Sequence, residues 1–333
     1  MSESGIREEP REALESALFE IKRVIIGQDA MLERVMVALL SGGHVLLEGV
    51  PGLAKTLTIK TVADVLGGSF RRLQFTPDLV PADLVGTRIY RADSGGFDTE
   101  LGPVFCNFLL ADEINRAPAK VQSALLEVMQ ERQVTIGHNT HHVPLPFLVL
   151  ATQNPIESEG TYPLPEAQVD RFMMKVLVGY PSPTEEFVIV ERAISPAPDT
   201  QAIVDPERLI EMQTRVEQVY VDPALIEYAV RLANATRDPA QVGLGELARY
   251  VEFGASPRAS INLVLAARAL AFVRGRDYVV PRDVTELAHD VLRHRLVLTY
   301  EALSDDVTAD AVLTQVMAAL PVPEAPPRGV LKP

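Results

Sequence analysis

The sequence is poor in features that define several classes of protein. It has one cysteine, Cys106, among 333 residues and no tryptophan. A single cysteine can form neither an intramolecular disulfide nor a cysteine-rich metal site, and a reducing cytosol suits such a chain. The apolar stretch from Ile261 to Val273 is too short to span a bilayer, and the acidic, polar opening MSESGIREEP argues against a signal peptide. We expect a soluble cytoplasmic protein that is not integral to a membrane.

Positive charge is also scarce. Lysine and arginine number 31 against 45 aspartates and glutamates, which gives a net charge of -14 and a pI near 5.0. This balance opposes broad attraction to phosphate backbones, although a local basic patch is compatible with it. We therefore expect no nucleic-acid partner.

The chain changes character near residue 182. Before it, five short apolar runs alternate with helical stretches: HVLLE (44–48), FRRLQF (70–75), VFCNFLLAD (104–112), PFLVLAT (146–152) and FMMKVLVGY (172–180). This pattern predicts an α/β core with a doubly wound, five-stranded parallel sheet at residues 1–182. After the joint YPSPTEEF, apolar residues recur at helical spacing and predict a small all-α domain at 183–320. The proline-rich end at 321–333 predicts a flexible tail.

The first strand is followed by GVPGLAKTL, a segment typical of a phosphate-binding loop. Its residues are Gly49, Val50, Pro51, Gly52, Leu53, Ala54, Lys55, Thr56 and Leu57. In such a loop, backbone N–H groups and a helix N-terminus hold the phosphates, the lysine contacts the β- and γ-phosphates, and the hydroxyl binds Mg²⁺. Ala54 stands where glycine is usual, and a Gly/Pro turn with a surface lysine is the alternative.

Carboxylates and an amide follow two later strands. Asp112 and Glu113 end the run FLLADE, where Asp112 is suited to organise Mg²⁺ and Glu113 to polarise the attacking water. The alternative is a capped strand end. Asn154 follows the next strand, where it can contact the γ-phosphate or the water, although Asn-Pro is by itself a turn signal. Together with Lys55, these residues predict a magnesium-dependent ATPase.

Two arginines have a functional interpretation and an ordinary one. Arg171, in DRF, is either a surface salt-bridge residue or a finger that enters a neighbouring subunit's active site. Arg258, in SPRA, is expected in the first turn of a helix, where the helix dipole disfavours a cation unless an anion compensates. A solvated arginine is the alternative.

Taken together, these residues resemble those of the MoxR family of AAA+ ATPases over roughly residues 10–320. The motifs are VIIGQ, EGVPGLAKT, FTPDLVPADLVG, GPVFCNFLLADEINRAP, LLEVMQERQVTIG, VLATQNPIESEGTYPLPEAQVDRF and SPRA. The resemblance implies a P-loop NTPase (AAA+) core with a helical lid. It also implies that Asn154 is the first sensor, Arg258 the second, and Arg171 the arginine finger, with Arg116 as a second candidate for contact in trans. The segment Ile25, Ile26, Gly27 and Gln28 would line the adenine pocket.

The resemblance further implies an insert in the second helix at about 84–104 and a hairpin before the first sensor at about 133–146. It implies a ring, most often a hexamer, in which ATP acts between subunits. The expected role is chaperone-like remodelling of a client, or insertion of a metal or cofactor into it, alongside a protein with a von Willebrand factor A domain. A nucleic-acid motor, a metal-chelatase ATPase subunit and a nucleotide-gated scaffold are the alternatives.

Two further groups of residues have structural alternatives. His138, His141 and His142 could hold a transition metal, but a solvated hairpin tip is the simpler interpretation. Cys106 lies in an apolar run without a nearby histidine, which predicts a small core residue rather than a nucleophile.

Overall fold

The computed structural model describes residues 9–50, 53, 55–93, 95–155, 160–194 and 198–324. Its centre is a five-stranded parallel sheet with the order β2-β5-β8-β1-β9. The strands are β1 (Val45–Glu48), β2 (Phe70–Gln74), β5 (Phe108–Asp112), β8 (Leu148–Gln153) and β9 (Met174–Leu177). Each lies within or overlaps one of the five apolar runs, so the predicted α/β core is confirmed.

The run at 104–112 begins as a loop rather than a strand. Residues 104–107 precede β5, which starts at Phe108. The side chain of Asn107 accepts hydrogen bonds from the backbone N–H and the hydroxyl of Ser69, at 3.0 and 2.9 Å. Its amide nitrogen donates to the carbonyl of Pro146. These bonds tie the entrance of β5 to the starts of its two neighbouring strands, and apolar composition could not predict them.

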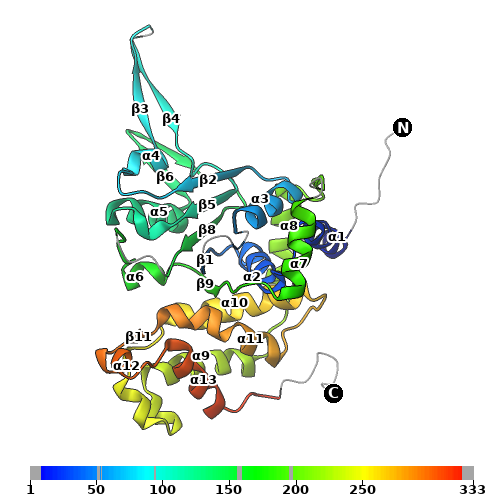
Figure 1. Cartoon of the computed structure of the whole chain (residues 1–333), viewed down its shortest axis with the longest axis vertical. Coiled ribbons are helices and arrows are strands. Elements are labelled where there is room, and N and C mark those ends of the chain that lie inside the picture. Colours follow the sequence, from blue (N-terminus) through cyan, green and yellow to red (C-terminus); the bar gives the residue numbers. More distant parts are fainter. Residues whose placement is uncertain are drawn as a thin grey trace.

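Helices cover both faces of the sheet (Figure 1). They are α1 (Pro10–Val24), α2 (Asp29–Leu40), α3 (Lys55–Val65), α4 (Pro81–Val85), the 3₁₀ turn η1 (Ile114–Arg116), α5 (Ala119–Glu131) and α6 (Glu166–Val169). Alternate residues of one strand enter different clusters: in β8, Leu148 and Leu150 pack with α1, α2 and α3, whereas Val149 packs with α5. Burial on both faces explains why the strands are continuous apolar runs.

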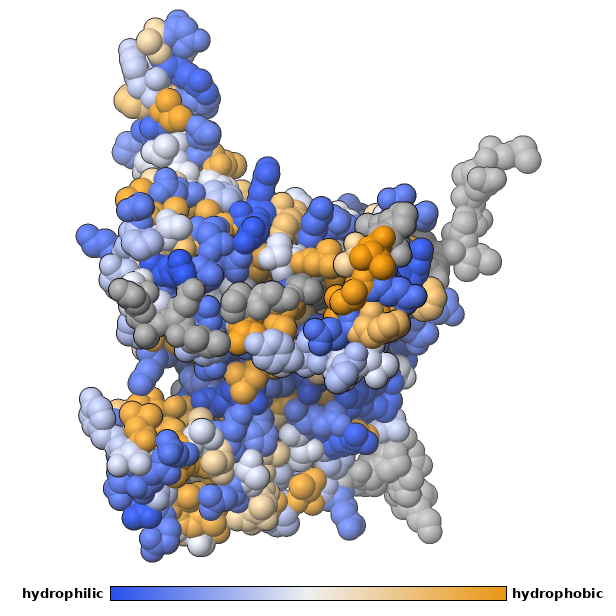
Figure 2. All heavy atoms as spheres, in the orientation of Figure 1, coloured by the Kyte–Doolittle hydropathy of each residue, from blue (hydrophilic) through white to orange (hydrophobic). Residues whose placement is uncertain are grey.

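Two antiparallel hairpins extend from the core. One is formed by β3 (Gly86–Arg91) and β4 (Gly96–Leu101), the other by β6 (Gln133–Ile136) and β7 (Asn139–His142). The β3–β4 hairpin projects far from the rest of the chain, and Figure 2 shows isolated apolar side chains on its largely hydrophilic surface. Tyr90 and Phe97 are exposed there and pack edge to face. The hairpins lie within the ranges expected for the insert and the hairpin before the first sensor.

The chain beyond residue 182 is mainly helical. It contains α7 (Pro183–Ala193), α8 (Pro206–Glu217), α9 (Pro223–Arg237), η2 (Pro239–Val242), η3 (Gly245–Arg249), α10 (Pro257–Val273), α11 (Pro281–Leu292), η4 (Arg293–Arg295), α12 (Tyr300–Ser304) and α13 (Ala309–Ala319). It also contains a small antiparallel pair, β10 (Val251–Phe253) and β11 (Val297–Leu298). The sequence analysis did not predict this pair, because such short strands have no detectable alternation.

The helical part after residue 182, which we call the lid, packs directly on the core. Helix α10 contributes buried side chains to the same hydrophobic cluster as α1, α2 and one face of the sheet. They include Ala259, Leu263, Ala266 and Leu270. Small side chains let α10 approach α2 closely, since packed interiors tolerate few voids. Among the described residues, no helix is long and apolar enough to cross a membrane.

Candidate active site

The carboxyl ends of the parallel strands surround a cavity of about 480 Å³. Parallel strands end at the same edge of a sheet, where α/β proteins bind their ligands. Residues at or directly after the carboxyl ends of β1, β2, β5 and β8 therefore converge there. The lining residues are Gly49, Leu53, Lys55, Thr56, Leu57, Arg72, Gln74, Asp112, Glu113, Thr152, Gln153 and Asn154.

Lys55 opens helix α3 at this cavity, so the N–H groups of the first helical turn lie beside its side chain. Its ammonium group donates a hydrogen bond to the carbonyl of Gly49. Burial lowers the pKa of Lys55, while the carboxylates of Asp112, Glu113 and Glu48 oppose this effect. A cation and helical N–H groups at one place form a phosphate-binding arrangement.

Val50 is half-buried against the main core. The other loop residues predicted to contact phosphate, Pro51, Gly52 and Ala54, lie outside the described residues.

Asp112 is held by two residues that the sequence analysis did not single out. The hydroxyl of Thr152 donates to its carboxylate at 2.6 Å. Arg72 donates to the other carboxylate oxygen through two nitrogens, at 2.7 and 3.2 Å. Strand pairing explains both contacts, because β2 and β8 flank β5 in the sheet. Only the sheet order could identify these partners.

Glu113 adopts an unusual backbone conformation at the end of β5. Its φ of 56° and ψ of 51° lie in the left-handed region, which costs a non-glycine residue about 1 kcal/mol or more. Its N–H donates to the hydroxyl of Thr152 at 2.8 Å. Its carboxylate accepts from Gln74 at 2.8 Å and pairs with Arg116 at 2.9 Å. These two partners hold the side chain of Glu113, and Arg116, a candidate for contact in trans, pairs within its own chain here.

Thr56 and Asp112 are the predicted metal ligands, and both line the cavity. A hydroxyl and a carboxylate are hard oxygen donors, which suit Mg²⁺. Among the described residues, no group of three or more His, Cys, Asp or Glu side chains could hold a metal ion. Magnesium does not need such a group, because it keeps waters and substrate phosphates as its other ligands. The residues present therefore fit Mg²⁺ bound together with a nucleotide.

Asn154 also lines the cavity, and it is buried directly after β8. Leu53 and Leu57 contribute apolar side chains to the cavity wall. Leu53 is buried, whereas Leu57 is exposed.

The segment Ile25–Gln28 lies beside the start of the lid and is not among the residues that line this cavity. Gly27 has a φ of 72°, and a Cβ added there would meet the side chain of Glu185 at 2.9 Å. Gln28 donates to the carbonyl of Gly179 at 3.5 Å. Ile25 is buried in the core, whereas Ile26 is half-buried. The predicted adenine segment therefore contacts the connection between core and lid.

Arg171 and Arg258 lie at the other edge of the sheet. They line a smaller cavity, of about 240 Å³, with His44, Met129, Gln130, Asp170 and Asn262. His44 precedes β1 and Gly49 follows it, and the five residue steps from one to the other span about 16 Å at 3.3 Å each. The structure does not bring either arginine to the first cavity of the same chain.

Asp170 organises this second cavity. Its carboxylate accepts from buried Arg295 at 2.8 Å and from the hydroxyl of Ser256 at 3.1 Å. Arg258, at the second position of α10, approaches it only to 3.5 Å and is exposed. The anion expected near Arg258 is thus Asp170, but the long contact leaves the guanidinium open to other acceptors.

The histidine and cysteine alternatives resolve differently. His141 and His142 are consecutive in β7, and consecutive strand residues point to opposite faces. This geometry disfavours a shared metal site with His138. Cys106 is buried, and burial raises the pKa of its thiol to about 12. It is a core residue, as predicted, and a thiol with this pKa is a poor nucleophile.

Comparisons with known proteins now decide the family. The sequence profile of the ATPase family associated with various cellular activities (AAA) matches residues 44–174, and that of the AAA lid domain matches residues 247–316. Chaperone MoxR1 of Mycobacterium tuberculosis is 59% identical over 93% of this chain and 82% of its own length. The chain belongs to the MoxR family of AAA+ ATPases. Protein MoxR of Methylorubrum extorquens is 32% identical over 91% of this chain and 93% of its own length.

A solved structure supports the fold of this MoxR-family ATPase. The crystal structure of a candidate ATPase from Cytophaga hutchinsonii is 47% identical, covers 95% of this chain and 96% of that one, and superposes with a TM-score of 0.89. The AAA+ core with a helical lid is therefore confirmed, and so is the class of activity, ATP hydrolysis.

Proposed function

We propose that this MoxR-family ATPase binds ATP with Mg²⁺ in the carboxyl-edge cavity and uses its hydrolysis to remodel a client protein. The observation that carries the proposal is the convergence of Lys55, Asp112, Glu113 and Asn154 on one cavity, from the start of α3 and the ends of β5 and β8. A lysine at a helix N-terminus, paired carboxylates and a polar amide are the parts that phosphoryl transfer needs.

The residues divide the chemistry as follows. The N-terminus of α3 and Lys55 bind the β- and γ-phosphates, while Thr56 and Asp112 hold Mg²⁺. The metal would neutralise charge on the phosphate oxygens. Glu113 orients the attacking water and accepts its proton, and Asn154 positions the water or the γ-phosphate.

Three contacts must change before this chemistry can proceed. Arg72 occupies one oxygen of Asp112, and Gln74 and Arg116 occupy the carboxylate of Glu113. These contacts partly neutralise Asp112 and hold the carboxylate of Glu113. We infer that nucleotide and a neighbouring subunit replace them and complete the site.

The arginines at the other edge of the sheet support a contribution from a neighbouring subunit. Arg171 and Arg258 cannot contact the nucleotide of their own chain, since β1 separates the two cavities. A rotated second copy could present them to the next cavity. Such a contact is heterologous, and repeated by rotation it closes a ring. A hexamer is the ring size that we propose.

The output of this ring is proposed to be chaperone-like. A relative is named a chaperone, and the projecting β3–β4 hairpin, with exposed Tyr90 and Phe97, offers a surface for a client. Insertion of a metal or cofactor into the client, a partner with a von Willebrand factor A domain and a cytoplasmic location stay predictions from the resemblance and the composition.

The test is Mg²⁺-dependent ATP hydrolysis measured against protein concentration, with particle mass followed by light scattering. Specific activity should rise as the ring assembles, because each site needs its neighbour. Glu113→Gln should bind ATP and assemble but lose about 10²- to 10⁴-fold in rate, the usual contribution of a general base. Activity that does not depend on assembly, or a fully active Glu113→Gln variant, would contradict the proposal.

A further inference from the structure

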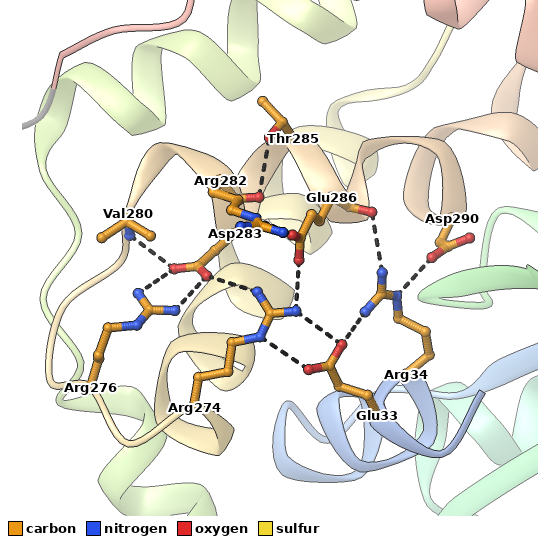
Figure 3. A network of polar contacts seen from close by, with 10 residues as sticks. All are labelled: Glu33, Arg34, Arg274, Arg276, Val280, Arg282, Asp283, Thr285, Glu286 and Asp290. Atoms are coloured by element: carbon orange, nitrogen blue, oxygen red, sulfur yellow. Dashed lines mark hydrogen bonds and ion pairs between the residues drawn. The ribbon is translucent and has the colours of Figure 1, made fainter. Parts of the chain in front are cut away.

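A network of ion pairs joins the lid to core helix α2 (Figure 3). Arg274, which follows α10, donates to both oxygens of Glu33 at 3.0 and 3.2 Å and pairs with Glu286 of α11 at 2.7 Å. Arg34, the neighbour of Glu33 on α2, pairs with Asp290 of α11 at 2.8 Å. The side chains of Arg34 and Asp290 are only 12% and 15% exposed. Because they are shielded from water, these pairs are screened less than surface pairs.

The network continues from the lid into the sheet. Arg293, at the end of α11, pairs with Asp290 at 2.5 Å and donates to the backbone carbonyl of Lys175 in β9 at 2.7 Å. The ammonium group of Lys175 pairs with Glu48 of β1 at 2.7 Å. Glu48 is the last residue of β1 and directly precedes Gly49, whose carbonyl accepts from Lys55. Polar contacts, joined by the side chain of Lys175 and the peptide bond between Glu48 and Gly49, therefore connect the nucleotide cavity to the lid.

This connection matters because the lid has no direct contact with the first cavity. Among the described residues, none that lines that cavity comes from the lid helices, and Arg258 lies at the opposite edge of the sheet. Within one chain, the described residues thus offer a route through β1, β9 and α11. Burial lowers the pKa of Lys55, and the nearby carboxylate of Glu48 opposes this effect. The two charges therefore interact.

We propose that the Glu48–Lys175 pair couples nucleotide binding to the position of the lid within the same subunit, through Arg293 and Asp290. When Lys55 turns from the Gly49 carbonyl to a phosphate, the charge beside Glu48 changes, and Lys175 is free to shift with it. Arg293 is bonded to the backbone of Lys175 and to Asp290, so a shift of β9 moves the start of the lid network. Lys175 is a positioning residue in this scheme and contacts no substrate.

The inference rests on the proposed function, and its test separates the two. Full-length wild type, Lys175→Met and Glu48→Gln are compared by amide hydrogen exchange of α11 (Pro281–Leu292), without nucleotide and with saturating Mg²⁺ and a slowly hydrolysed ATP analogue. Analogue binding is measured separately by titration. We expect the wild type to show an exchange change in α11 on binding, and either single variant to bind the analogue but lose most of that change.

A double variant and a control make the result specific. If Glu48 and Lys175 act as a pair, the double variant should lose no more of the response than either single one, as in a double-mutant cycle. Arg282→Gln is the control, because it removes a cation of the same lid network. The Arg282 side chain is 80% exposed, and in Figure 3 it pairs only with Glu286. It should keep the full response.

Each outcome decides between the claims. If wild type bound no analogue, the proposed function would fail and this inference with it. If wild type bound the analogue but α11 did not respond, or if both single variants responded like wild type, only the coupling through Glu48 and Lys175 would be overturned. Should Lys175→Met fail to fold, Glu48→Gln alone decides, since it keeps the shape of the side chain.

Discussion

The two edges of the central sheet differ in the charge that they collect. The carboxyl edge holds Asp112 and Glu113 with Lys55 in a cavity of about 480 Å³. The opposite edge holds Arg171 and Arg258 beside a cavity about half that size, 240 Å³. One edge has the residues that we propose bind a metal–nucleotide complex, and the other has two arginines and Asp170, which line no part of that cavity. From this difference we propose that one active site is divided between two copies of the chain.

Mixing two inactive variants, one altered at each edge, is the strongest test of whether the two edges act together across subunits. Arg171→Ala should reduce ATP hydrolysis about 10³-fold or more, which is the range for an arginine finger. Glu113→Gln should also be inactive, because it lacks the carboxylate that accepts the proton of the attacking water. When the two inactive variants are mixed, interfaces that combine an intact Glu113 with an intact Arg171 should restore a measurable fraction of the rate. A mixture as inactive as its components would show that Arg171 does not act in trans.

Arg258 should have a smaller effect in the same assay. Its contact with Asp170 is long, and its side chain is 49% exposed, so we expect Arg258→Ala to lose about tenfold, the equivalent of one charge-assisted hydrogen bond. Arg249→Ala, on the same lid but paired with Glu301, is the control and should keep the wild-type rate. Equal effects of the two changes would place Arg258 outside the active site.

His44 makes the stability of the arginine edge depend on pH. Its ring accepts from the N–H of Val149 and contacts the carbonyl of Met129, and burial lowers its pKa from 6.5 to about 4. The unfolded chain thus binds more protons between these values, so the contribution of His44 is full above pH 6.5 and is lost as pH falls towards 4. The shift corresponds to about 3 kcal/mol.

Urea unfolding at pH 7 and pH 4.5 measures this dependence. Wild type should lose more stability on acidification than His44→Gln, in which the titrating group is absent. Buried His294, whose pKa is also lowered, is present in both proteins and cancels in the comparison. The same pH dependence in both proteins would contradict the assignment to His44.

The smallest expected effect belongs to Gln74 at the carboxyl edge. It donates to the carboxylate of Glu113, and removing one such hydrogen bond is worth about 1 kcal/mol, or roughly fivefold. We expect Gln74→Ala to raise the basal ATPase rate by up to that factor, because the carboxylate is freed to meet water. A lower rate, measured at the same degree of assembly, would mean that Gln74 supports the active geometry instead.

Local sequence was sufficient for much of this protein. The five apolar runs predicted the strands, because strands buried on both faces need continuous apolar residues. The spacing from Gly49 to Thr56 and the position of Asp112 and Glu113 predicted where chemistry would gather, because the ends of parallel strands meet at one edge. Helical spacing of apolar residues predicted the second, all-α domain, and the family resemblance added its role as a lid and the two hairpins.

Tertiary structure decided what depends on neighbours that are distant in sequence. The partners of Asp112 and Glu113, which are Arg72, Gln74 and Thr152, come from strands whose order cannot be read from local patterns. The position of Arg258 depended on how α10 packs under the sheet. Sequence by itself determined the strands, the loop at Lys55 and the chemical class, because these follow from local periodicity and spacing. Only the packed chain determined that the arginines lie at the edge of the sheet opposite Lys55.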